Sequence, residues 1–158
     1  MNIGLLARKT LHSQPGGDTV QVKQSAAALK RLGHTCSIIT SGMALPKDLD
    51  VLHFFNLGRP SDVLYYFKKF PGKKIISTVY VDYSMADKIR YPRLFRLLGS
   101  HRIEFLKTIT RALNGSDKWP CFDYLRLGQK RSMQRVLNQS NVVITSSRSE
   151  LTRILQWS

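Results

Sequence analysis

Five short apolar segments, each bounded by polar or turn residues, are spread along this 158-residue chain. They cover residues 2–7, 35–40, 50–55, 73–81 and 140–147. Each is too short for a buried helix, and several are rich in β-branched or aromatic residues, which is typical of strands buried on both faces. Helical spacing of apolar residues lies between them. Strands that alternate with helices predict an α/β fold with a Rossmann-like, mainly parallel sheet flanked by helices.

The predicted helices have recognisable ends. The first runs from a cap at Asp18 or Thr19 to Gly33, which stands where a C-terminal glycine belongs. The second covers residues 61–70 behind a Ser61 cap, and the last follows a Ser149 cap. These signals place one helix in most of the connections that a parallel sheet needs.

One connection is much longer than the others, and we expect a helical insertion at about residues 85–138 between strands four and five. Pro92 suits a helix start, and the stretch after it has apolar residues on one face if the helix slips near Gly99. The predicted stripe consists of Leu94, Leu98, Phe105, Ile109 and Leu113. We therefore expect a single Rossmann-like domain over 1–158 that carries this insertion.

Charge restricts the class of partner. The chain has 25 Lys and Arg residues against 10 Asp and Glu, a formal net charge of +15. Such a balance favours an anionic partner: nucleic acid, an anionic membrane surface or a phosphorylated ligand. Cys36 and Cys121 are far apart and outside any CxxC spacing, so no metal site is expected. The sequence has no apolar run long enough for a transmembrane helix and no signal peptide, so we expect a cytoplasmic protein.

Much of the charge is concentrated in the predicted insertion. Residues 88–135 contain twelve basic and three acidic side chains, a net charge of +9, with aromatic residues between them. The cations chosen as an anionic-ligand or membrane patch are Arg90, Arg93, Arg96, Lys107 and Arg111. A basic helix with aromatic residues can lie on anionic lipid. It can also contact RNA phosphates, or be a solvated face of an ordinary insertion.

Polar residues follow the predicted strands at their carboxyl ends, where doubly wound sheets bind ligands. The loop PGGD after the first strand carries Gly16, Gly17 and Asp18, and its glycines would let a ligand approach the backbone and a helix N-terminus. It matches neither GxGxxG nor a Walker A loop, and a plain turn is the alternative reading.

Two further strand ends carry candidate contacts. His53 and Asn56 belong to the third strand and its loop, although a histidine beside two phenylalanines is often a core residue. Tyr80 and Asp82 follow the fourth strand, where Asp82 could instead cap a turn. No local signature of a catalytic triad or of paired carboxylates is present, so the sequence shows no complete catalytic machinery.

Taken in order, these pieces resemble the N-terminal half of retaining GT-B glycosyltransferases, especially those of glycosyltransferase family 4. The resemblance rests on MNIGLLAR, PGGDTVQVKQSAAALKRLGHTCSIIT, DVLHFFN, STVYVD and QRVLNQSNVVITSSRSE. It implies a Rossmann-like acceptor-side domain that transfers a sugar from a nucleotide sugar to a glycan or lipid-linked acceptor, in the synthesis of cell-surface polysaccharide. It also implies a location at the inner face of the plasma membrane.

The resemblance also implies roles for residues and partners. Gly16 and Gly17 would lie near the donor phosphates, and Tyr80 stands where the family has a histidine. Asp82 matches the family's acid, and Ser146 or Ser147 matches the serine after strand five. The family needs neither a metal nor another cofactor in this half. Its nucleotide-sugar-binding domain has no counterpart in this sequence, so we expect a C-terminal domain or partner chain to supply it and the chain to be inactive alone.

A non-enzymatic, basic module for nucleic acid is the alternative. It rests on charge alone, because the sequence has no RRM, KH, zinc or helix-turn-helix signature. Nucleic acid is therefore the less favoured partner.

Overall fold

A five-stranded, all-parallel sheet forms the centre of the structure, a computed structural model that describes residues 1–80 and 84–156. Its strands, in the order β2-β1-β3-β4-β5, are β1 (Asn2–Ala7), β2 (Thr35–Thr40), β3 (Val51–Phe55), β4 (Lys73–Ser77) and β5 (Val142–Ile144). Six helices flank the sheet or extend from it in the described part of the chain. The predicted Rossmann-like α/β fold is confirmed.

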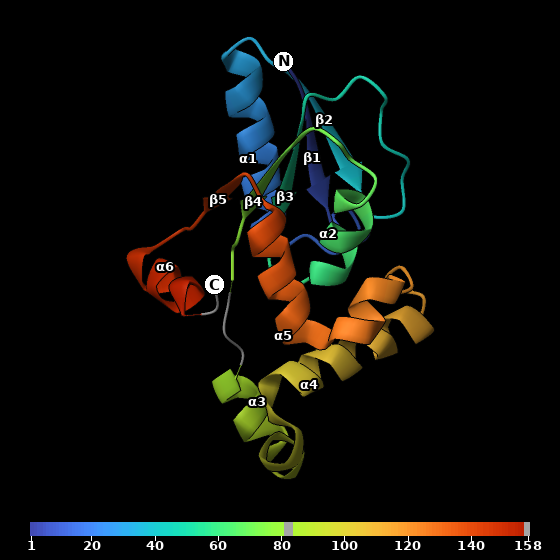
Figure 1. The fold of residues 1–158 in the computed structure, drawn as a ribbon, viewed down its shortest axis with the longest axis vertical. Helices are drawn as coiled ribbons and strands as arrows, with labels where there is room; N and C mark the ends of the chain where they lie inside the picture. Colours follow the sequence, from blue (N-terminus) through green and yellow to red (C-terminus); the bar gives the residue numbers. More distant parts are fainter. Residues whose placement is uncertain (81–83, 157–158) are drawn as a thin grey trace.

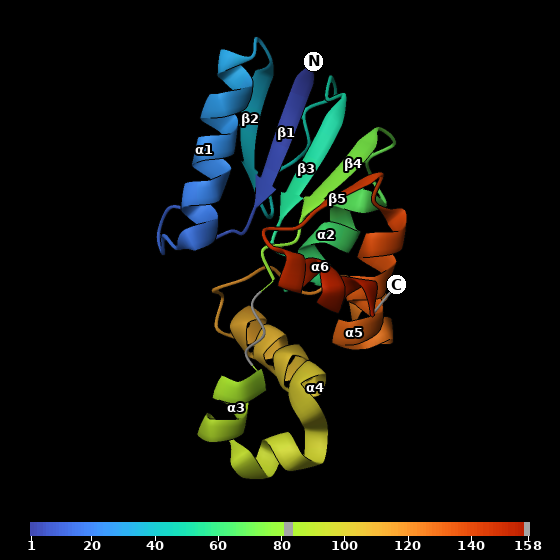
Figure 2. The same ribbon diagram turned by 90° about the vertical axis from the view of Figure 1, so that its left-hand side faces the viewer.

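Helices cover the two faces of the sheet unequally. Helix α1 (Gly17–Arg31) lies on one face, and α2 (Pro60–Phe67) and α5 (Phe122–Gln139) lie on the other (Figures 1 and 2). Successive strand side chains point to opposite faces, so Leu5 joins the core beside α1 while Leu6 joins the larger core beneath α2 and α5. The near-continuous apolar strands of the sequence follow from this double coverage.

The helix starts differ from the predicted ones by one to three residues. Gly16, and neither Asp18 nor Thr19, is the N-cap of α1. Helix α2 begins at Pro60, because a proline at the first helical position has its φ preset and needs no N–H partner. Helix α6 (Arg148–Leu155) is capped by Ser147 instead of Ser149, with the Ser147 Oγ accepting from the Glu150 N–H at 3.2 Å.

The insertion is helical, as predicted, and extends beyond the carboxyl ends of the strands (Figures 1 and 2). It contains α3 (Ser84–Arg90) and α4 (Pro92–Leu113), whereas α5, at the end of the predicted range of about 85–138, packs on the sheet as part of its core. The expected slip in α4 is a kink at Gly99, whose φ of 70° lies in the left-handed region that glycine tolerates. A second kink, at Gly128 in α5, was not predicted.

The predicted apolar stripe of α4 is wrong in part. Leu94 and Leu113 are exposed, whereas Ile103 and Ala112 are buried. The kink rotates the two arms of α4 relative to each other, so a stripe drawn along one continuous helix does not face one neighbour.

The last two strands are shorter than predicted. Strand β4 ends at Ser77, and β5 contains three residues, of which Val142 is 46% exposed. All three residues of β5, the edge strand of the sheet, are exposed. The expectation that this fifth strand is buried on both faces is therefore wrong for the described residues.

The central position of β3 gives a stability prediction. Leu52 is fully buried in the core beneath α2 and α5, so Leu52→Ala should lower the free energy of unfolding by about 2–5 kcal/mol. Leu32→Ala is the matched control, because Leu32 is 72% exposed and its truncation should cost less than about 1 kcal/mol. Urea unfolding followed by circular dichroism measures both, and equal losses would contradict this packing.

Candidate functional site

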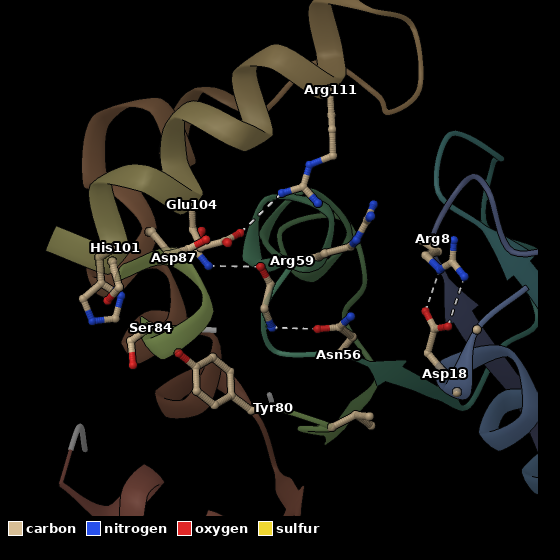
Figure 3. A pocket seen from close by; sticks show the side chains of 16 residues that line it. Arg8, Asp18, Asn56, Arg59, Tyr80, Ser84, Asp87, His101, Glu104 and Arg111 are labelled. Carbon is tan, nitrogen blue, oxygen red and sulfur yellow. Dashed lines mark hydrogen bonds and ion pairs between the residues drawn. The ribbon is translucent and has the colours of Figure 1, made fainter. Parts of the chain in front are cut away.

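A polar cavity of about 390 Å³ opens at the carboxyl ends of β1, β3 and β4, between the sheet and the insertion (Figure 3). Its sheet side is formed by Arg8, Gly16, Gly17, Asp18, Asn56, Gly58, Arg59, Val79 and Tyr80. Its other side is formed by Ser84, Asp87, Ser100, His101, Glu104, Arg111 and Gln129. Ligands of doubly wound sheets bind at this edge, so this cavity is the candidate site.

An ion pair fixes the glycine loop at the mouth of the cavity. Arg8 Nε lies 2.6 Å from Asp18 Oδ2, and Arg8 Nη2 lies 3.2 Å from Asp18 Oδ1. Burial acts to raise the pKa of Asp18, but the Arg8 guanidinium lowers it overall. A Cβ on Gly16 would come within 3.3 Å of both side chains, so the glycine lets this pair lie close against the loop.

Strained backbone occurs at two residues that line the cavity. Asn56 has a φ of 79° and Val79 a φ of 39°, and no other described non-glycine residue has a positive φ. The Asn56 side-chain oxygen Oδ1 accepts a hydrogen bond from the Gly58 N–H at 2.9 Å. This local hydrogen bond offsets part of the cost of the positive φ at Asn56. A β-branched residue at positive φ is an outlier, and such residues concentrate at functional sites.

Glu150 at the start of α6 holds the loop after β4. Its carboxylate accepts hydrogen bonds from Thr78 Oγ1, the Tyr80 N–H, and both the N–H and Oγ of Ser146, each at 2.6 Å. Burial acts to raise the pKa of Glu150, but these donors lower it overall. The Ser147-x-x-Glu150 spacing is a capping-box pattern, the sequence signal that could have identified this residue.

A chain of alternating charges connects the insertion to the loop after β3. Arg59 contacts Asp117 at 2.7 Å, and Arg111 lies 3.8 Å from Asp117 and 3.4 Å from Glu104. Lys107 continues the chain, 2.8 Å from Glu104 and 2.6 Å from Asp87. We call the six residues Arg59, Asp117, Arg111, Glu104, Lys107 and Asp87 the charge chain. It spans the cavity from the sheet to α3.

The charges also affect Lys107. Burial acts to lower its pKa, but the two neighbouring carboxylates raise the pKa overall, which keeps the ammonium charged.

The structure brings several predicted site residues together. Gly16, Gly17, Asp18, Asn56 and Tyr80 all line the cavity, although they come from three segments that are separate in the sequence. Asp82 lies outside the described residues.

His53 and Ser146 are not in this group. The His53 ring is buried within β3, with Nε2 2.8 Å from Ser77 Oγ and the ring stacked on Phe55 at 4.4 Å between centroids. Burial lowers the pKa of His53 to about 4, so it is neutral near pH 7. Ser146 is bound to Glu150 and does not line the cavity. These contacts match the core reading of His53 and a structural role for Ser146.

The predicted cationic patch separates into two groups. Arg90, Arg93 and Arg96 are exposed on α3 and the first arm of α4. Lys107 and Arg111 are half-buried in the charge chain, and Arg111 also lines the cavity. The helical insertion therefore does not have one uniform basic face.

Sequence reasoning did not select most of the wall formed by the insertion. Asp87, His101 and Glu104 come from α3 and α4, and Gln129 donates from Nε2 to the Gly58 carbonyl at 3.0 Å. The acidic residues could have indicated this wall from the sequence. Carboxylates are scarce in this basic segment, and each is expected to pair with a neighbouring cation. Arg8, directly after β1, was also not selected.

Comparison with known proteins gives no relative for this chain: no protein family matches it, and no curated protein or solved structure is significantly similar to it. Among residues 1–80 and 84–156, no group of three or more His, Cys, Asp or Glu side chains is placed to hold a metal ion. In the same residues, no helix has the length and apolarity needed to cross a bilayer.

The contacts of Glu150 predict a pH-dependent stability effect. Glu150→Gln removes a charged acceptor of four hydrogen bonds and should lower the free energy of unfolding by about 2 kcal/mol at pH 7. The folded pKa lies below the ordinary 4.5, so this stabilisation is present above pH 4.5 and is lost as the pH falls through the folded pKa. The gap between wild type and variant should therefore close in acid.

Urea unfolding between pH 3 and pH 7 measures this gap. Asp123→Asn removes the same charge from another helix start and should show a small difference at every pH. A gap for Glu150→Gln that widens in acid would contradict the assignment.

Proposed function

We propose that this chain is the acceptor-binding, membrane-docking half of a retaining GT-B glycosyltransferase. The observation that carries the proposal is the cavity at the carboxyl ends of the strands, where the glycine loop, Asn56 and Tyr80 converge. This is the place and the set of loops that the resemblance in the sequence assigns to the reacting groups. The acceptor is a glycan or a lipid-linked sugar, and the product is a cell-surface polysaccharide or its precursor.

Each part of the cavity has a role in this proposal. The amides of Gly16 and Gly17 lie at the N-terminus of α1, which favours the negative charge of a departing diphosphate. Tyr80 reaches the cavity from the loop after β4 (Figure 3) and contacts the sugar. Asp82, outside the described residues, stays a predicted contact from the sequence alone. A C-terminal domain or a partner chain supplies the nucleotide-sugar site, so catalysis takes place between the two.

The membrane contact is assigned to residues 84–98, which we call the basic tip. It combines the exposed cations Lys88, Arg90, Arg93 and Arg96 with the exposed apolar side chains Met85, Ile89, Leu94 and Leu97. The tip lies at the end of the molecule farthest from the free end of the sheet (Figure 1). Apolar side chains at a basic surface can enter the headgroup region while the cations attract anionic lipid. The location that we propose is therefore peripheral, at the inner face of the plasma membrane.

Activity is tested by supplying the proposed nucleotide-sugar-binding half. The chain is co-expressed with the coding sequence that follows it in its genome, and transfer of labelled sugar from nucleotide sugars to lipid-linked acceptors is measured. Tyr80→Phe should reduce transfer at least tenfold, because it removes a hydroxyl at the cavity. Tyr65→Phe, on α2 and outside the cavity, should leave transfer unchanged. A following sequence without a nucleotide-sugar site, or no transfer of any sugar, would overturn the proposal.

Membrane docking has a separate test. Co-sedimentation with vesicles containing phosphatidylglycerol should exceed that with pure phosphatidylcholine. Changing Arg90, Arg93 and Arg96 together to Gln should reduce the anionic binding by about a hundredfold, at about 1 kcal/mol for each cation. The matched control changes Lys23, Lys30 and Arg31 to Gln, which removes three exposed charges from α1.

Two outcomes would contradict docking through the basic tip. One is equal loss of vesicle binding in both triple variants, which would reflect net charge alone. The other is binding to neutral and anionic vesicles to the same extent. Tight, salt-sensitive retention of RNA with no vesicle binding would favour the nucleic-acid alternative.

A further inference from the structure

Asp87 is a buried carboxylate with one oxygen unused. Its side chain is 6% exposed, and its Oδ1 accepts from Lys107 Nζ at 2.6 Å. Its Oδ2 is buried and has no hydrogen-bond partner among the described residues. An unpaired oxygen on a buried carboxylate is costly, so a hydrogen-bond donor that reaches Asp87 Oδ2 would be favoured.

The charge around Asp87 restricts what that group can be. Asp87 and Glu104 lie side by side on the insertion wall (Figure 3), and Lys107 contacts both carboxylates. Arg111 lies 3.4 Å from Glu104, so two acids already face two cations. A charge-balanced cluster in a strongly basic chain favours a neutral hydrogen-bond donor over a further ion.

The opposite wall offers the complementary groups. Asn56 and Arg59 carry amide and guanidinium donors, and both line the same cavity across from the two acids (Figure 3). A hydroxyl group both donates and accepts, so a ring with several hydroxyls can meet acceptors on one wall and donors on the other. The volume of about 390 Å³ is within the range of small-molecule pockets and is large enough for a sugar ring.

We propose that Asp87 and Glu104 form a carbohydrate-binding subsite, in which a ligand hydroxyl donates a hydrogen bond to Asp87 Oδ2. The inference rests on the proposed function only in taking this sugar to be the acceptor. This subsite gives the insertion a second role, because α3 and α4 supply the wall that binds the hydroxyl groups of the ligand. Asp87 binds and orients the sugar and forms no bond to it.

The test measures binding of methyl glycosides of glucose, galactose, mannose and N-acetylglucosamine to the whole chain, by saturation-transfer NMR and calorimetry. At least one glycoside should bind, and Asp87→Asn should weaken it about tenfold to a hundredfold, as expected for loss of a hydrogen bond to a charged group. Asp123→Asn is the matched control, with the same loss of charge outside the cavity, and should bind as wild type does.

A second measurement keeps the test decisive if Asp87→Asn does not fold. Deoxy analogues of the bound glycoside are titrated into the wild-type chain, and removal of one particular hydroxyl should lower the affinity at least tenfold. Where the variant folds, that same hydroxyl should no longer matter to it. Absence of glycoside binding, small and uniform losses along the deoxy series, or unchanged binding by Asp87→Asn would each overturn the subsite.

The outcome of this binding test can be distinguished from the outcome of the test of the proposed function. Glycoside binding through Asp87 without sugar transfer by the co-expressed pair would support the subsite and overturn the enzyme proposal. Transfer that is indifferent to Asp87→Asn would do the reverse.

Discussion

The charge chain is the interaction on which the shape of the cavity depends. Helices α3 and α4 extend past the end of the sheet, where Phe105 of α4 stacks on Tyr124 of α5 at 5.3 Å between ring centroids. The pair Arg59–Asp117 links the loop after α4 to the loop after β3. Its side chains are 6–35% exposed, so a single pair would be worth little, but the residues of the chain share partners and hold one another in place.

The two walls of the cavity have different origins, which decides how far the sequence could predict them. Parallel strands end at one edge, so the apolar runs were enough to predict that the glycine loop, Asn56 and Tyr80 meet. The position of His53 required the register of β3 against β4, because only that pairing brings its ring to Ser77. The wall that carries Asp87 and Glu104 depends on the kink at Gly99, and a helical pattern fixes no angle between two arms of a helix.

Backbone strain lies on the sheet wall, and ionic pairing lies on the insertion wall. Asn56 and Val79 are held at positive φ where β3 and β4 end, and Glu150 fixes the second of these loops through the Tyr80 N–H. Strain of about 1–3 kcal/mol at each residue persists only where neighbouring contacts determine the backbone. The carboxylate of Glu150 provides such contacts from α6, a helix distant in sequence. This role explains why Glu150 and Ser146 are hydrogen-bonded to each other and do not line the cavity.

The distribution of acids connects the interior of the molecule to its surface. The chain has ten acidic residues, and Asp18, Asp87 and Glu104 line the cavity while Asp117 and Glu150 brace it. Half of the negative charge is thus gathered around one site, where each of these carboxylates is matched by cations or hydrogen-bond donors. The basic tip, by contrast, has four exposed cations and only the buried carboxylate of Asp87 within its span. Concentrating acids in the cavity therefore leaves the tip positive, so one arrangement of charge produces both a neutral polar pocket and the cationic surface that the proposed membrane contact requires.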